Sequence, residues 1–312
     1  MTALASTRSA APGLLPAMLR DPGGLFGIAM LAVLVLVAAF GPHLALHDPL
    51  AIGLRGRLRP PAWLEGGGWD YPLGTDHLGR DVLSRIIMGA RVTLLVGVSV
   101  VAIAGCFGTA LGVLAGYFGG RLDALVMRFV DTQVAFPGLL IALIILAVIR
   151  PSIGTVILVL GINGWMVFAR MARGVVLSVR QTPYVEVAEM IGATAQRIIL
   201  RHILPNLAAP MLTLTVLEFA RIILAEASLS FLGVGIQPPD TSWGLDVATG
   251  KGYIFRAWWL VTFPGLAIAL SVLGVNLLAS RLRLALDPTE RDKEYARAAA
   301  GEAMSGTGAS AV

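Results

Sequence analysis

The chain has 312 residues, of which 56% are hydrophobic and 14% charged, and its formal net charge is +5. A soluble domain carries about 25% charged residues, and a water-soluble protein of this length could not bury so much apolar surface. Composition therefore excludes a soluble globular protein. Because the basic residues stand in short segments beside apolar spans, their excess indicates membrane orientation rather than nucleic-acid binding. The single cysteine, Cys106, excludes an intrachain disulfide and a cysteine-cluster metal site.

Six segments are long and apolar enough to cross a membrane as helices, which need about 20 such residues. In chain order they are residues 25–40, 92–120, 131–150, 151–169, 206–232 and 257–280. The first segment also resembles a signal peptide, but no small-residue cleavage site follows it promptly, so we favour a retained span. The sequence predicts an all-α integral membrane protein with about six transmembrane helices.

Lysine and arginine are distributed unevenly between the segments that connect these spans. If the N-terminus lies inside, the inner segments carry 14 of these residues and the outer segments carry 8. This bias predicts that both termini are cytoplasmic. We expect a cytoplasmic segment over residues 1–22, a transmembrane domain over 23–284, and a cytoplasmic tail over 285–312 whose Ala, Gly, Ser and charged residues favour disorder.

The predicted outer loop, about residues 43–91, is long and rich in Pro and Gly. Its end, residues 79–91, places apolar side chains on one helical face, which predicts a short amphipathic helix at the membrane interface before the second span. Asp81 and Arg85 have the spacing of an ion pair on that helix.

Histidines in the same loop permit two interpretations. His43, His47, Asp76 and His77 carry groups that nickel accepts as ligands. No helix is assured at these positions, however, so ordinary loop residues are the favoured interpretation and we predict no metal site.

A glycine stripe marks the second span, with Gly108, Gly112 and Gly116 at four-residue spacing and Gly105 near the same face. Small residues at this spacing let another helix approach closely. We favour packing within the chain, and contact with a second membrane subunit is the alternative.

The segment between the fourth and fifth spans predicts two short helices joined by a glycine. Thr182-Pro183 suits the cap and first residue of one helix, and Gly192 suits its end. Thr194 can cap a second helix that ends before Pro205. Four apolar residues make the first helix unsuited to remain bare in water, namely Val185, Val187, Met190 and Ile191.

This segment, about residues 170–206, resembles the EAA loop of ABC importer permeases through Glu186-x-Ala188-x-x-x-Gly192, Arg197 and His202-x-Leu204-Pro205-Asn206. In that family the loop forms coupling helices that sit in a groove of the cytoplasmic ATPase. The resemblance implies a coupling role for Tyr184, Glu186, Ala188, Gly192, Arg197, His202 and Pro205. The motif departs from the family pattern at Val187, where a second Ala is usual, and at Glu189, where a basic residue is common.

Other segments narrow the resemblance to the dipeptide, oligopeptide and nickel class of importers, and within it to the second of two permeases. They are residues 73–81, 225–239, 242–244, 276–278 and 286–288. The resemblance, which covers residues 25–288, implies a type I permease fold in the prokaryotic cytoplasmic (inner) membrane. It also implies a second similar permease, two ATP-binding subunits or domains and an extracytoplasmic solute-binding protein as partners.

The chain carries no Gly-x-x-x-x-Gly-Lys-Ser/Thr phosphate loop and no nucleophile–base constellation. We therefore expect no catalytic residue and no cofactor on this chain, with ATP and Mg²⁺ bound by the partner ATPases.

Ionisable residues inside a span are costly and by default functional. Glu218 and Arg221 are three residues apart in the fifth span and can pair on one face. We assign them, with Glu226 and with Asn276 of the sixth span, to a translocation path or permease interface, and purely structural pairing is the alternative.

The expected function is ATP-driven import of small solutes, with di- or oligopeptides favoured. Nickel chelates, other small solutes, or a secondary transporter without an ATPase are the alternatives.

Overall fold

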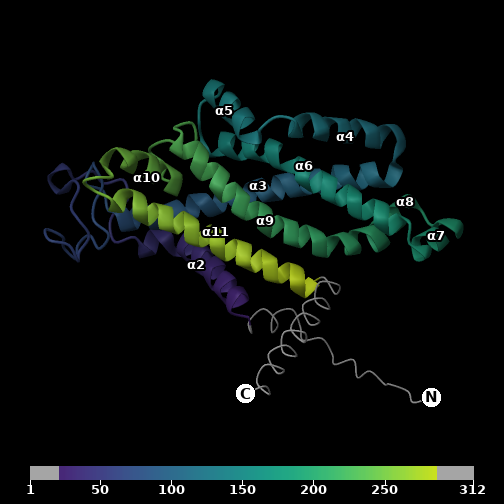
Figure 1. Ribbon diagram of the computed structural model, residues 1–312, viewed down its shortest axis with the longest axis horizontal. Coiled ribbons are helices and arrows are strands. Elements are labelled where there is room, and N and C mark those ends of the chain that lie inside the picture. Colours follow the sequence, from purple (N-terminus) through teal and green to yellow (C-terminus); the bar gives the residue numbers. More distant parts are fainter. Residues whose placement is uncertain (1–20, 287–312) are drawn as a thin grey trace, which may run out of the picture.

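A computed structural model describes residues 21–286, and in that range the chain consists of helices α2 to α11 with no β-strand (Figure 1). Five long helices run side by side: α2 (Pro22–Leu44), α3 (Val82–Phe118), α6 (Ile153–Arg180), α9 (Leu204–Phe231) and α11 (Trp259–Leu286). Shorter helices complete the bundle: α4 (Gly120–Val134), α5 (Gly138–Val148), α7 (Pro183–Met190), α8 (Ala195–Ile198) and α10 (Trp243–Gly250). The predictions for residues 1–20 and 287–312 lie outside the described residues.

Among the described residues, five helices are long and apolar enough to cross a membrane, and α4 with α5 makes a sixth if this bent pair is one span. The prediction of about six spans is thus confirmed. The third span differs from the straight helix expected over residues 131–150, because α4 and α5 meet at 82°. Pro137 lies at the break, immediately before α5, and proline supplies no backbone N–H to continue a helix.

The prediction of a separate interfacial helix over residues 79–91 is wrong. These residues instead lead into α3, which begins at Val82 and runs through 37 residues to Phe118. Asp81 caps this helix, since its carboxylate accepts hydrogen bonds from the backbone N–H groups of Leu83 and Ser84. The carboxylate is therefore engaged by backbone, and Arg85 pairs with other residues described below.

The second predicted coupling helix does not end before Pro205. From Ala195 it continues through a π-helical turn, Ile199–Ile203, into α9, so that one helical run extends from Ala195 to Phe231. The N–H of Leu204 bonds to the carbonyl of Ile199, five residues earlier. Pro205 has no backbone N–H and cannot donate the hydrogen bond of a regular α-helix. The wider turn just before it lets the helix continue past the proline.

The glycine stripe packs α3 directly against α6. A Cβ added at Gly108 would lie 2.2 Å from the carbonyl oxygen of Trp165, and one at Gly112 would lie 2.3 Å from that of Ala169. At Gly116 the nearest atom would be the Cβ of Val176, 2.9 Å away. These distances confirm that the stripe serves packing within the chain.

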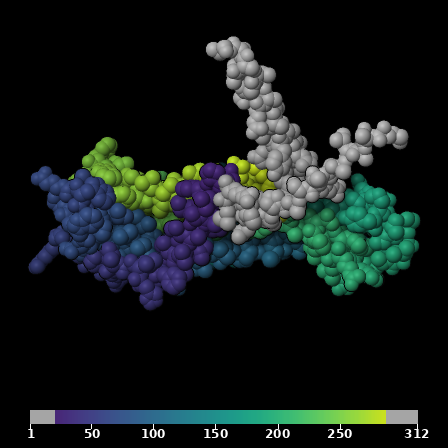
Figure 2. Space-filling model, turned by 90° about the horizontal axis from the view of Figure 1, so that it is seen from below, coloured from purple at the N-terminus to yellow at the C-terminus, as the bar shows by residue number. Residues whose placement is uncertain are grey.

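The two ends of this bundle carry different elements. The loop that precedes α3 lies with α10 at one end of the long axis, and α7 and α8 lie at the other (Figure 1). The space-filling view shows the same separation, with the blue outer-loop residues far from the green-teal end (Figure 2).

Candidate functional site

The elbow, meaning α7, the turn at Gly192 and α8, has the predicted helix–glycine–helix form. Thr182 is extended at the N-cap and Pro183 is the first residue of α7. Gly192 has a φ of +80°, in the left-handed region that glycine alone adopts freely. Thr194 then caps α8 by accepting a hydrogen bond from the N–H of Arg197 at 3.4 Å. Local sequence signals are thus sufficient to define this turn.

The elbow has a buried face and an exposed apolar tip. Val185 and Ala188 point inward, and Val185 packs into a cluster that includes Val176 of α6 and Ile203. On the other side the tip exposes four apolar side chains: Tyr184 (47%), Val187 (50%), Met190 (78%) and Ile191 (79%). Clustered exposed apolar side chains of this kind indicate a surface that binds a partner.

The residues predicted for coupling do not all lie on this tip. Glu186, Arg197 and Pro205 are exposed, whereas Ala188 is buried and anchors the elbow to the bundle. His202 and Tyr184 lie together, with ring centroids 5.7 Å apart.

Asn206 ties these two side chains to α9. Its Nδ2 donates to the Tyr184 hydroxyl at 3.2 Å and to the His202 carbonyl at 2.6 Å. Tyr184 and His202 therefore connect α7 to the first turn of α9.

An arginine missed by the sequence reasoning makes a second connection. Arg180, at the end of α6, forms an ion pair with Glu189 of α7 (Nε to Oε1, 3.5 Å). Its Nη1 also donates to the carbonyl of Tyr117 in the last turn of α3 at 2.7 Å. The acidic residue at position 189 thus has a partner within the chain, and a basic residue in the last turn of α6 was the available signal for it.

Within α9 the structure confirms that Glu218 and Arg221 pair. The Arg221 Nε and Nη2 atoms lie 2.7 and 2.6 Å from the same oxygen, Oε2 of Glu218. Glu218 is 8% exposed and Arg221 is 54% exposed, so the carboxylate is buried while the guanidinium reaches the surface.

Glu226 and Asn276 occupy different environments from this pair. Glu226 is buried and accepts a hydrogen bond from Ser230 Oγ at 2.7 Å, and the same hydroxyl accepts from the N–H of Ile236 at 3.0 Å. Glu226 therefore holds the turn that follows α9. Asn276 is exposed on α11.

Two cavities lie against opposite sides of α9. One, of about 1030 Å³, is almost wholly apolar and is lined by residues such as Val98, Met211 and Phe219. The other, of about 350 Å³, is lined by polar as well as apolar residues, among them Asn206, Thr213, Leu217 and Arg283. At 3.6 residues per turn, Asn206, Thr213, Leu217 and Arg221 share one side of the helix.

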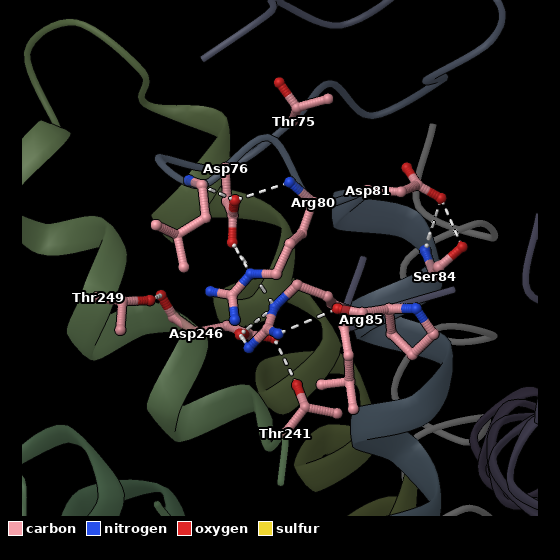
Figure 3. A network of polar contacts seen from close by, with 12 residues as sticks. Thr75, Asp76, Arg80, Asp81, Ser84, Arg85, Thr241, Asp246 and Thr249 are labelled. Carbon is pink, nitrogen blue, oxygen red and sulfur yellow. Dashed lines mark hydrogen bonds and ion pairs between the residues drawn. The ribbon is translucent and has the colours of Figure 1, made fainter. Parts of the chain in front are cut away.

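At the end of the bundle that holds α10, four buried charged side chains form what we call the outer network, after the predicted outer loop: Asp76, Arg80, Arg85 and Asp246 (Figure 3). Arg80 Nε lies 2.6 Å from Asp76 Oδ2, and Arg85 Nε lies 2.8 Å from Asp246 Oδ1. Thr241 Oγ1 lies 3.4 Å from the other oxygen of Asp246. Two positive and two negative groups compensate one another, which burial of charge requires.

The network joins α10 both to the segment before α3, which carries Asp76 and Arg80, and to the first turn of α3, which carries Arg85. Arg85 and Asp246 are 161 positions apart in the sequence. Burial raises the pKa of Asp246, and the adjacent Arg85 acts in the opposite direction. No local pattern predicts such a pairing. The only signal in the sequence was that residues 73–81 and 242–244 resemble segments of the same importer class.

The loop histidines have partners of their own. His47 stacks on Tyr71 with ring centroids 4.6 Å apart, and His77 stacks on Tyr253 at 5.5 Å. Burial is also the main cause that lowers the pKa of His77. Within the described residues, no three His, Cys, Asp or Glu side chains are placed to hold a metal ion.

Comparison with known proteins identifies the class of protein to which the chain belongs. Residues 108–292 match the family described as binding-protein-dependent transport system inner membrane component. The di/tripeptide transport system permease protein DppC of Pseudomonas aeruginosa is 41% identical over 86% of this chain and 88% of that protein. The dipeptide transport system permease protein DppC of Escherichia coli K12 is 42% identical over 86% and 90%, respectively.

A solved structure shares the fold. A chain of the MetNI methionine ABC transporter, in inward-facing conformations, aligns with a TM-score of 0.53 at 16% identity, over 65% of this chain and 96% of that one. Helical spans, an elbow with an apolar tip and these matches define a membrane permease with the type I importer fold. The chain belongs to the family of binding-protein-dependent transport system inner membrane components, the permease subunits of ABC importers.

Proposed function

We propose that the chain is one of two similar permeases in an importer of di- or oligopeptides. Its partners in this proposal are two ATP-binding subunits or domains, which bind ATP and Mg²⁺, and an extracytoplasmic solute-binding protein. Both termini lie in the cytoplasm. Peptides are favoured over nickel chelates or other small solutes because the relatives at about 40% identity are peptide or dipeptide permeases by name.

The observation that carries the coupling role is the exposed tip of the elbow. Met190 and Ile191 are 78% and 79% exposed on a segment whose other face is packed into the bundle. Docking of this tip in an ATPase groove removes apolar surface from water, which supplies binding energy of about 25 cal/mol per Å². A secondary transporter would leave this surface without a partner.

The mechanism proposed for coupling follows from the connections of the elbow. Val185 packs against α6, and Arg180 links α7 to the end of α3. The helical run from Ala195 to Phe231 joins the elbow to the membrane portion of α9. Closure of the ATPases would therefore displace α3, α6 and α9 together and open the path toward the outside, where the binding protein releases its cargo.

Reconstitution tests the proposal. The full chain, coexpressed with its cognate permease and ATPases, should copurify with them and, in liposomes supplied with the binding protein, take up a labelled dipeptide only when ATP is present. The purified chain alone should hydrolyse no ATP. Uptake by the lone chain in liposomes without ATP would establish a secondary transporter and overturn the proposal. Uptake of a nickel chelate but of no peptide would overturn the cargo class.

Labelling tests the proposed orientation. In a Cys106→Ala background, a cysteine at the exposed outer-loop position Asp70 should react with an impermeant thiol reagent in intact cells. One at Gln196, exposed in α8, should react only after the membrane is opened. The reverse pattern would invert the topology.

A further inference from the structure

Arg221 presents a charge on the surface of a helix that crosses the membrane. It lies ten residues before the end of α9 at Phe231, which places it about 15 Å along the helix axis from that end. Its side chain is 54% exposed in the isolated chain. A guanidinium facing hydrocarbon is costly, so charged groups at such depth face protein or water. The side of α9 that carries Arg221 therefore faces the interior of the assembled transporter.

Glu218 pairs with only part of the guanidinium group of Arg221. Both contacts, from Nε and Nη2, go to one carboxylate oxygen, Oε2. A guanidinium has five N–H donors, and among the described residues Nη1 of Arg221 has no hydrogen-bond partner. The pair thus holds the arginine in place while leaving donors directed away from Glu218.

Arg221 lies one helical turn beyond the more polar of the two cavities beside α9, on the same side of the helix. Leu217, one turn before Arg221, lines the cavity of about 350 Å³ together with Asn206, Thr213 and Arg283. On the outer side, Ser228 is exposed about two turns beyond Arg221 and shares its face. Asn206, Thr213, Arg221 and Ser228 thus place polar groups at intervals along this side of α9, separated by leucines such as Leu217 and Leu224, whereas the opposite side borders the apolar cavity.

We propose that Arg221, positioned by Glu218, is a transient binding site for a carboxylate of the peptide cargo as it passes through the membrane. This inference rests on the proposed function. Guanidinium and carboxylate form charge-assisted, often bidentate hydrogen bonds, which suits the terminal carboxylate that unblocked peptides share. Because Glu218 already offsets much of the positive charge, the site holds this carboxylate weakly. A site within a path must release its cargo as readily as it binds it.

The test compares two variants of the complete transporter, reconstituted in liposomes with its binding protein. Glu218→Gln removes the buried carboxylate and keeps Arg221, whereas Glu218→Gln with Arg221→Gln removes both charges and leaves no unpaired one. The difference between these two variants isolates the guanidinium. We expect the double variant to take up Ala-Ala about tenfold more slowly than the single variant, the effect of one lost charge-assisted hydrogen bond.

A second readout separates cargo binding from a structural role. The ratio of uptake of Ala-Asp, which has two carboxylates, to uptake of Ala-Ala is measured for each variant at saturating binding protein. Because the same binding protein serves every assay, a change in this ratio reports on the permease. We expect the ratio to fall in the double variant and to stay at or above the wild-type value in Glu218→Gln.

Three outcomes would overturn the inference. Equal uptake and equal ratios in the two variants would show that Arg221 does not contact cargo. Loss of the second permease from the purified double variant would show instead that Arg221 pairs across the permease interface. Slow uptake with an unchanged ratio would indicate a positional role only. If the wild-type complex shows no ATP-dependent peptide uptake at all, the proposed function itself fails, which distinguishes the two failures.

Discussion

At the end of the molecule that holds α10 four charged side chains are buried, whereas at the elbow four apolar side chains are exposed. The outer network contains equal numbers of positive and negative groups, and each of them is at most 10% exposed. The elbow tip reaches 78% and 79% exposure at Met190 and Ile191. The charges of the outer network are therefore compensated within one chain, whereas nothing in the chain covers the apolar tip of the elbow.

This contrast predicts different consequences of damage at the two ends. Substitutions in the outer network should lower the stability of the chain itself. Substitutions on the elbow should leave the isolated chain intact and impair the assembled transporter. Three experiments test the comparison, beginning with the largest expected effect.

Gly192→Val should abolish ATP-dependent uptake while membrane insertion and abundance remain close to normal. A Cβ at position 192 would meet no atom within 4 Å, so the effect comes from the backbone, whose φ of +80° a β-branched residue strongly resists. Uptake and copurification of the ATPases measure the effect. Gly192→Asn is the matched control and should retain most activity, because asparagine tolerates this conformation. Normal uptake by the valine variant would show that the elbow does not couple the subunits.

Arg85→Met should lower the free energy of unfolding by about 3–5 kcal/mol, because it leaves the buried carboxylate of Asp246 without its partner. Thermal unfolding of the detergent-purified chain measures this loss. Combining Arg85→Met with Asp246→Leu removes both charges and should restore most of the stability. A double variant as unstable as the single one would contradict the view that charge compensation is the purpose of the network.

Replacing both Met190 and Ile191 by Ser should weaken ATPase docking by about 1–3 kcal/mol, the range for apolar side chains that lose burial. The stability of the isolated chain should change by no more than about 0.5 kcal/mol, since both side chains are exposed. ATPase affinity in detergent measures the first effect and thermal unfolding the second. Leu50→Ser with Ile52→Ser, an exposed apolar pair in the outer loop, is the control and should leave ATPase affinity unchanged.

The features that sequence could predict are those with local causes. Thr182, Pro183, Gly192 and Thr194 each act on backbone within a few residues, and the structure confirms the turn they define. The glycine stripe of α3 was predictable for the same reason, because helical periodicity brings its members to one face.

The features that sequence could not predict depend on direction or on distant partners. The sequence of an apolar segment indicates how long a span is, but it does not indicate the 82° bend between α4 and α5. Arg85 pairs with a residue 161 positions away, where local spacing suggested Asp81 instead. The pairing of Glu218 with Arg221 was foreseen, but the exposure of Arg221 and the burial of Glu218 required the fold.

The π-helical turn at Ile199–Ile203 has a consequence for the orientation of everything beyond it. A π-turn accommodates one residue more than an α-turn, and each residue of a helix advances the side-chain direction by about 100°. If the run from Ala195 were regular, Arg221 would be rotated by about that angle around the axis of α9 relative to the elbow. The wide turn beside Pro205 therefore sets the angular register between the exposed tip of the elbow and the side of α9 that carries Arg221.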